Sequence, residues 1–130
     1  MNLEANVRAW LEYAEADRRS AYNAMRAADY RDVAFHCQQV IEKLLKAVIV
    51  LQTGQRPPYL HNYWKLWQYV SGITCPPDVQ EALAALAPHY FLSRYPIMEI
   101  EYDLLAAQEM LERMELIWTW LTGSANLVTE

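Results

Sequence analysis

DYRDVAFHCQQVIEKLLKAVIV, at residues 29–50, has the apolar spacing of a long helix. Its apolar residues recur every three or four positions, which places them on one face of an α-helix. This stripe consists of Val33, Ala34, Cys37, Ile41, Leu44, Leu45, Val48 and Ile49. Asp29 can cap the helix, Asp32 falls in its first turn, and Gly54 can stop it. We therefore predict a helix over residues 30–52.

The same spacing predicts helices on both sides of this segment. The pattern over residues 3–27 is that of an amphipathic helix, and residues 100–122 carry a seam with alternating steps of three and four. The seam residues are Leu104, Ala107, Leu111, Met114, Trp118 and Leu121. Residues 61–71 predict a short helix and residues 77–88 a further one, which Pro88 weakens or ends. Pro96 disfavours helical backbone at Tyr95.

The predicted fold is an all-α, up-and-down antiparallel helical bundle of four main helices plus a short one. Over half of the 130 residues are apolar, which is enough to form one hydrophobic core. Only three residues are glycine, and this low number favours helices. We expect one domain over residues 1–123. The tail at 124–130 follows Gly123 and is expected to fray.

Charge and cysteine content narrow the classes of function. The net charge of −5 does not favour a general nucleic-acid-binding surface, so phosphate binding needs a local positive patch. Two cysteines, Cys37 and Cys75, do not make a disulfide framework, and we expect reduced thiols. No apolar run is long enough to span a bilayer and no signal peptide is recognisable, so we expect a cytoplasmic protein without a membrane partner.

The last predicted helix is apolar on more than one face. Met110, Ile117 and Trp120 lie off its main seam, so the helix either lies centrally or meets a partner chain. We predict a homodimer with Ile117 and Trp120 on the second face, and Tyr102 and Met98 near the pairing cleft.

Three short stretches together resemble the HEPN domain family. Residues 29–50 resemble its second helix, with the order aromatic, Gln-Gln-x-x-Glu-Lys-x-x-Lys-Ala. PPYLHNYWKL, at 57–66, resembles the His-Asn/Asp-hydrophobe turn that opens the next helix. SRYP, at 93–96, resembles the Arg-Tyr-Pro before the last helix of small stand-alone members.

The resemblance implies a compact helical bundle that pairs into a homodimer. Many HEPN proteins resemble metal-independent ribonucleases, in which an Arg and a later His are separated by four to six residues and two copies form one composite site. Small members are often encoded beside a small nucleotidyltransferase, and such a pair can act as toxin and antitoxin. In some, a Tyr two residues after the His receives nucleotides from that partner.

Arg94 occupies the position of the family's active arginine, but the histidine is missing. The positions where the family has it are Glu99, Ile100 and Glu101 in this sequence, and none is histidine. The ribonuclease site is therefore incomplete, because the reaction needs a group that moves a proton. If Ile100 replaces the histidine, Tyr102 falls where the modifiable tyrosine would lie.

Other candidate residues have ordinary structural explanations beside functional ones. His36 is interpreted as a satisfied helix residue and His61 as a cap or staple of the third helix, while His89 or Glu101 is a candidate second catalytic group with Arg94. The three histidines do not have the spacing of metal ligands, so we predict no bound metal, and we expect no cofactor. Glu42, Lys43 and Lys46 match the family motif, yet a solvated helix face explains them equally well. The sharper functional alternative is a buried Glu42 that faces Arg94.

Three functional interpretations remain open. The first is a nucleotide- or RNA-binding HEPN protein with a nucleotidyltransferase partner and a degenerate ribonuclease site. Its expected nucleotide- or phosphate-binding residues are Arg94, Tyr95, Tyr102, Glu42 and Lys46. The second is an active ribonuclease that uses Arg94 with a nonstandard second residue. The third is a dimeric scaffold.

Overall fold

The protein is an all-helical bundle. A computed structural model describes residues 2–95 and 100–127, and within these residues it contains six helices and no strand. The helices are α1 (Leu3–Arg26), α2 (Tyr30–Thr53), α3 (Tyr63–Trp67), α4 (Pro77–Leu86), α5 (His89–Leu92) and α6 (Leu104–Ser124). The predicted fold class is confirmed. No helix in this described part is long and apolar enough to cross a membrane.

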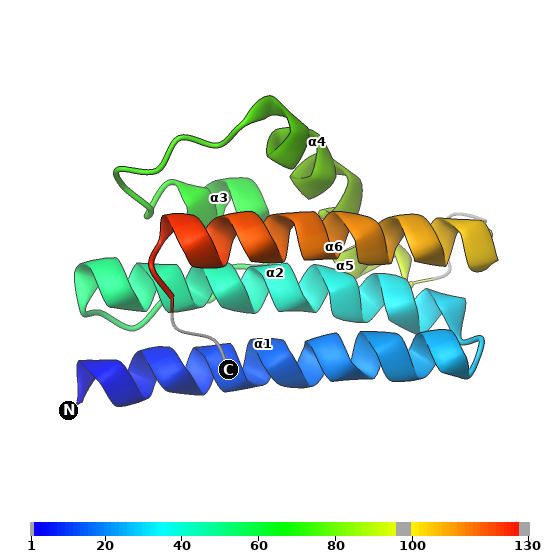
Figure 1. Ribbon diagram of the computed structural model, residues 1–130, viewed down its shortest axis with the longest axis horizontal. Helices are drawn as coiled ribbons and strands as arrows, with labels where there is room; N and C mark the ends of the chain where they lie inside the picture. Colours follow the sequence, from blue (N-terminus) through cyan, green and yellow to red (C-terminus); the bar gives the residue numbers. More distant parts are fainter. Residues whose placement is uncertain (1, 96–99, 128–130) are drawn as a thin grey trace.

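Helix α2 lies at the centre of the bundle and contacts each of the other five helices. Every residue from Leu44 to Val50 is buried, so α2 buries its whole circumference there instead of the single predicted stripe. Figure 1 shows the reason: α1 lies on one side of α2, and α3 and α4 lie on the opposite side with α6 alongside. The enclosure of α2 therefore buries three of its polar residues, Gln38, Glu42 and Lys46.

The three long helices run up and down along one axis. Helix α1 is antiparallel to both α2 and α6, which therefore point the same way (Figure 1). Helices α1 and α6 are joined by Arg18, which donates two hydrogen bonds to the Glu115 carboxylate at 2.8 and 2.6 Å. Tyr22 donates a third to the same carboxylate at 3.0 Å, and the Arg18 guanidinium lies 4.5 Å from the Trp118 ring centroid. This ion pair fixes the register of α1 against α6.

The chain between α2 and α4 is anchored to α2. Gly54 ends α2 in a left-handed conformation (φ 68°), which glycine adopts without strain. Asn62 caps α3, because its side chain accepts hydrogen bonds from the backbone of Trp64 and Lys65. The predicted capping role of His61 is therefore wrong. Tyr63, fully buried, donates a 2.6 Å hydrogen bond to the backbone oxygen of Gln38 in α2.

The region around the two prolines differs from the prediction. Helix α4 ends at Leu86, and Pro88 caps the separate short helix α5, where its carbonyl accepts bonds from Phe91 and Leu92. A proline is compatible with a helix start because the first N–H groups need no intrahelical partner. Helix α6 begins only at Leu104, where the Asp103 side chain caps it. Pro96, Met98 and Glu99, all named in the sequence predictions, lie outside the described residues.

The second apolar face of α6 is covered within the chain. Ile117, predicted at a dimer face, is completely buried, and this prediction is wrong because α3 and α4 occupy the space that was assigned to a partner. Trp120, the other residue assigned to that face, is partly buried and packs on Trp67 with ring centroids 5.8 Å apart. Leu104 of the predicted seam is instead exposed. Beyond α6, Leu127 is buried, so the described part of the tail packs on the bundle.

Candidate functional site

Arg94 lies just after α5, with its side chain over two aromatic rings. The guanidinium carbon is 5.4 Å from the ring centroids of both Phe35 of α2 and Tyr90 of α5. Arg94 is exposed and, within residues 2–95 and 100–127, it has no carboxylate partner. The rings lie against the guanidinium group itself, and its forked N–H donors suit a planar or tetrahedral anion.

One prediction was that a buried Glu42 faces Arg94. The structure shows instead that Glu42 binds Lys46 and His61. Its buried carboxylate binds Lys46, whose Nζ lies 3.2 Å from Oε2, one helical turn away on α2. It also binds His61, whose Nδ1 lies 3.1 and 3.2 Å from the two carboxylate oxygens. The solvated-face interpretation of Glu42 and Lys46 is therefore wrong as well: both side chains are more than nine-tenths buried and form an ion pair.

His61 connects the buried ion pair to Arg94. Its ring stacks on Tyr90 with centroids 4.2 Å apart and planes 13° apart, and Arg94 lies over that same tyrosine. We call these residues, Glu42, Lys46, His61, Tyr90 and Arg94, the Arg94 cluster. Because a carboxylate only accepts hydrogen bonds, Nδ1 of His61 donates to Glu42, and the side chain that carries Nε2 is 51% exposed.

His61 and Tyr90 are the members of this cluster that sequence reasoning missed. The His-Asn turn was a signal for His61, but it was assigned to capping because the partner, Glu42, lies 19 positions earlier. Nothing local to Tyr90 indicated that it would lie between a histidine and an arginine.

His89 and Tyr102 form a separate pair. Nδ1 of His89 and the Tyr102 hydroxyl are 2.8 Å apart, and the Arg31 guanidinium lies 5.2 Å from the Tyr102 ring centroid. Burial lowers the pKa of His89, with a smaller contribution from the charge of Arg113. Burial raises the pKa of Tyr102. Both groups are thus held in their neutral forms near pH 7. The structure gives His89 no contact with Arg94, the residue it was predicted to assist.

Two further predicted site residues stand apart from the Arg94 cluster. Tyr95 is exposed and packs on Phe91, with centroids 4.7 Å apart. Glu101 is exposed just before α6.

His36 has the structural role that was predicted for it. Its Nδ1 lies 2.8 Å from the Asp17 carboxylate, which also accepts a hydrogen bond from Lys43. Burial raises the pKa of Asp17, but the hydrogen bonds from His36 and Lys43 outweigh this effect and hold the pKa below its usual value. These contacts join α1 to α2. Lys43 thus serves the helix pair and not the Arg94 cluster.

The described residues contain no group of three or more His, Cys, Asp or Glu side chains that could hold a metal ion. Cys37 and Cys75 are free, and burial raises the pKa of both thiols. The chemistry that the site offers is therefore that of an exposed arginine, a carboxylate-bound histidine and aromatic rings. Fold and site together define a small helical protein with a cationic, aromatic surface suited to an anion.

The comparisons with known proteins place the chain in a family. Residues 7–124 match the HEPN domain, and the chain belongs to the HEPN domain family. TT1696 from Thermus thermophilus is similar in structure, with a TM-score of 0.81 and 26% identity over 91% of this chain and 97% of that one. ST0689, an archaeal HEPN homologue, has a TM-score of 0.72 and 25% identity over 92% of this chain and 97% of its own. None of the curated proteins compared with the chain matches it.

Proposed function

We propose that this HEPN protein binds the phosphate of a nucleotide or RNA at the Arg94 cluster, as the HEPN half of a toxin–antitoxin-like pair with a small nucleotidyltransferase. The observation that carries the proposal is the exposed guanidinium of Arg94, set on Phe35 and Tyr90 without a carboxylate partner among the described residues. The partner assignment rests on family resemblance and on Tyr102, which falls at the position of the modifiable tyrosine if Ile100 replaces the missing histidine.

The neighbours of Arg94 support phosphate binding over a purely structural role. An arginine that only holds a loop would use its donors on carbonyls or a carboxylate, and the nearby acidic residue, Glu42, is already bound by Lys46 and His61. The exposed guanidinium plane of Arg94, which lies over Phe35 and Tyr90, is itself a surface on which a base can stack. The cluster therefore combines an arginine that can bind phosphate with aromatic rings, although the chain as a whole has a net charge of −5.

We also propose a homodimer, with a different face of α6 from the one predicted from the sequence. HEPN domains are commonly dimeric. Leu105 and Leu116 are exposed to 63% and 40%, and their spacing of three helical turns places them on one face of α6. Leu104 is also exposed at the start of the same helix, and Gln108, Glu109 and Glu112 lie between Leu105 and Leu116 on that face. A second copy would cover the exposed leucines together with the polar residues between them.

Arg94→Ala is expected to weaken nucleotide binding by roughly tenfold to a hundredfold, because charge-assisted hydrogen bonds contribute about 1.5–3 kcal/mol. The measurement is calorimetric titration of the purified protein with a nucleoside monophosphate and a short oligoribonucleotide. Arg94→Lys should recover only part of the affinity, since lysine keeps the charge but loses the planar fork. Arg19→Ala, an exposed arginine of α1, is the matched control and should bind normally. Unchanged binding by Arg94→Ala would make this arginine structural.

A ribonuclease is the second candidate function, and one observation favours it. His61 is bound to Glu42 through Nδ1 and stacks on Tyr90, the ring over which Arg94 also lies, and the neutral form of this imidazole has Nε2 as a proton acceptor. In such a reaction the 2′-hydroxyl would pass its proton to Nε2 as its oxygen attacks phosphorus. The bond from phosphorus to the 5′-oxygen would break, and this oxygen would take a proton from water. The protonated His61 would then return its proton to the resulting hydroxide. The products would be a 2′,3′-cyclic phosphate and a 5′-hydroxyl.

We expect weak or absent RNA cleavage, because the family's histidine after Arg94 is missing. The assay compares the wild-type protein with Arg94→Ala and His61→Ala on a labelled RNA, with His36→Ala as the control histidine. Robust cleavage that both Arg94→Ala and His61→Ala abolish, while His36→Ala retains it, would replace the binding proposal with the enzyme. It would also identify His61 as the second group in place of His89 or Glu101.

A further inference from the structure

We propose that a second site in this protein binds a nucleoside phosphate independently of Arg94. The site is a hollow of about 590 Å³ between α1, α2 and the loop at residues 54–59, within the size range of small-molecule pockets. We call it the Trp10 pocket, and its functional lining is Asn6, Trp10, Lys46, Gln55, Arg56 and Tyr59.

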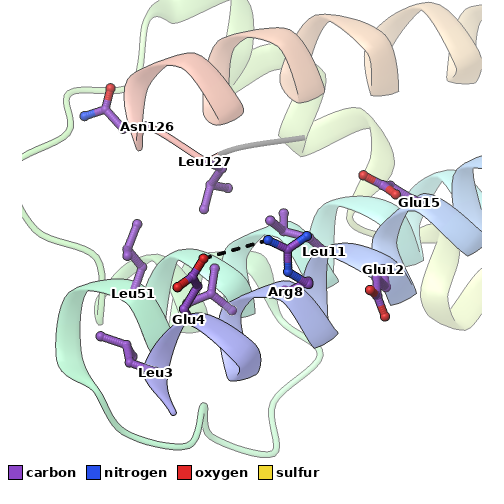
Figure 2. A pocket seen from close by; sticks show the side chains of 10 residues that line it. Leu3, Glu4, Arg8, Leu11, Glu12, Glu15, Leu51, Asn126 and Leu127 are labelled. Carbon is purple, nitrogen blue, oxygen red and sulfur yellow. Dashed lines mark ion pairs between the residues drawn. The ribbon is translucent and has the colours of Figure 1, made fainter. Parts of the chain in front are cut away.

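The charge of the Trp10 pocket selects an anion. Lys46 and Arg56 line it, and no carboxylate is among its described lining residues, although the chain as a whole carries −5. A second hollow of about 270 Å³ shows the opposite arrangement (Figure 2): it is lined by three glutamates and by Arg8, which lies 3.8 Å from Glu4 in an ion pair. The positive lining therefore distinguishes the Trp10 pocket from this second hollow.

The aromatic lining selects a planar group on that anion. Trp10 is partly buried on α1, whereas Tyr59 is 90% exposed on the loop. Pro57 and Pro58 restrict the backbone immediately before Tyr59, which limits the positions that its ring can take. Stacking on such rings is how proteins bind bases without requiring a particular sequence.

The polar side chains of the pocket have donors to spare. Within the described residues, the side chains of Asn6, Gln55 and Arg56 have no hydrogen-bond or ion-pair partner. Carboxamides offer a donor and an acceptor side by side, which suits the edge of a base, and a guanidinium suits a phosphate. A nucleoside phosphate uses all three kinds of lining at once, whereas inorganic phosphate or a nucleoside uses only part.

Lys46 belongs to both the Trp10 pocket and the Arg94 cluster. Its Nζ is 5.5 Å from the Trp10 ring centroid and 3.2 Å from the Glu42 carboxylate that binds His61. A phosphate near Lys46 would compete with Glu42 for this ammonium. Ligand in the pocket should therefore change the surroundings of His61. Because His61 also belongs to the Arg94 cluster, the readout that reports on the Trp10 pocket is the His61 shift in Arg94→Ala.

Titration with AMP, adenosine and inorganic phosphate tests the site, with NMR detection of the His61 ring proton. We expect AMP to bind more tightly than either fragment and to shift the His61 signal in both the wild type and Arg94→Ala. Tyr59→Ala should weaken AMP binding about fivefold or more, and Arg56→Ala about tenfold or more. Both side chains are exposed, so these variants should fold. Tyr69→Ala and Arg19→Ala are the matched controls and should bind AMP normally.

The results separate this site from the Arg94 cluster. Binding that persists in Arg94→Ala but weakens in Tyr59→Ala and Arg56→Ala supports the Trp10 pocket, even if the Arg94 cluster binds nothing. A short oligoribonucleotide that competes with AMP would identify an RNA end as the source of the nucleoside phosphate, whereas lack of competition would indicate a free nucleotide. Equal affinity for AMP and inorganic phosphate, or binding unchanged by both pocket variants, would overturn the proposal.

Discussion

Glu42→Ala should lower the free energy of unfolding by about 3–5 kcal/mol, since removal of one partner leaves the other charge of a buried ion pair uncompensated. In this protein the charge left without a partner is the ammonium of Lys46, whose side chain is only 7% exposed. The substitution also removes the hydrogen bonds to His61. Urea unfolding followed by circular dichroism measures the change, with the slope of the transition checked for two-state behaviour.

The chain contains a matched control for this experiment. Glu109 and Arg113 of α6 have the same spacing of four positions, with an N–O distance of 3.6 Å, but their side chains are 48% and 33% exposed. Glu109→Ala should cost no more than about 0.5 kcal/mol, the usual worth of an exposed helical pair. The double variant Glu42→Leu with Lys46→Met should be more stable than Glu42→Ala, because it removes both charges. A cost for Glu42→Ala as small as that for Glu109→Ala would contradict the buried pair.

Ile117→Ala should destabilise the protein by about 2–5 kcal/mol, because it leaves a cavity in a packed core. Ile117 is fully buried by its own chain, and its neighbour Leu116, 40% exposed, is the control. Leu116→Ala should cost less than Ile117→Ala, about 1–1.5 kcal/mol in the unfolding free energy of the monomer, because its side chain stays partly in water and its truncation leaves no enclosed cavity. The measurement is urea unfolding at several protein concentrations, because a dimer adds a concentration-dependent contribution.

Light scattering separates the two faces of α6. If the face of α6 that carries Leu105 and Leu116 pairs two copies, replacing both leucines by aspartate should convert a dimer to a monomer while the helical spectrum remains. Ile117→Ala should lower the unfolding free energy without changing the mass of the folded protein. A monomer mass for the wild type at micromolar concentration would rule out the homodimer. A dimer that persists in the double aspartate variant would place the interface elsewhere.

Most of the helices could be predicted from the sequence, because helix formation depends on residues three and four positions apart. The stripe from Val33 to Ile49 predicted α2 to within a residue at each end, and α1 was placed equally well. The region after α4 was less accurate. Pro88 was taken as the end of one helix, whereas it also begins another, since the missing N–H suits both positions.

The candidate site was predicted only in part. The resemblance to HEPN domains identified Arg94, Glu42 and Lys46 as residues of interest, but not their contacts. Glu42 proved to bind His61 rather than Arg94, and Arg94 to lie over Phe35 and Tyr90. These partners come from α2, the loop before α3 and the segment around α5, and no local pattern records which of them meet.

The sequence by itself determined which segments are helices and that their apolar faces must be buried. Only the tertiary structure decided what covers each face. Ile117 was assigned to a partner chain because a single apolar stripe is enough to pack against one neighbouring helix. The short elements between α2 and α6 instead fold back against α6, and Ile117 is buried by its own chain. The same enclosure of α2 makes Glu42 and Lys46 a buried pair. Helical periodicity is local, whereas burial and ion pairing depend on contacts between segments far apart in the chain, which spacing along one helix does not record.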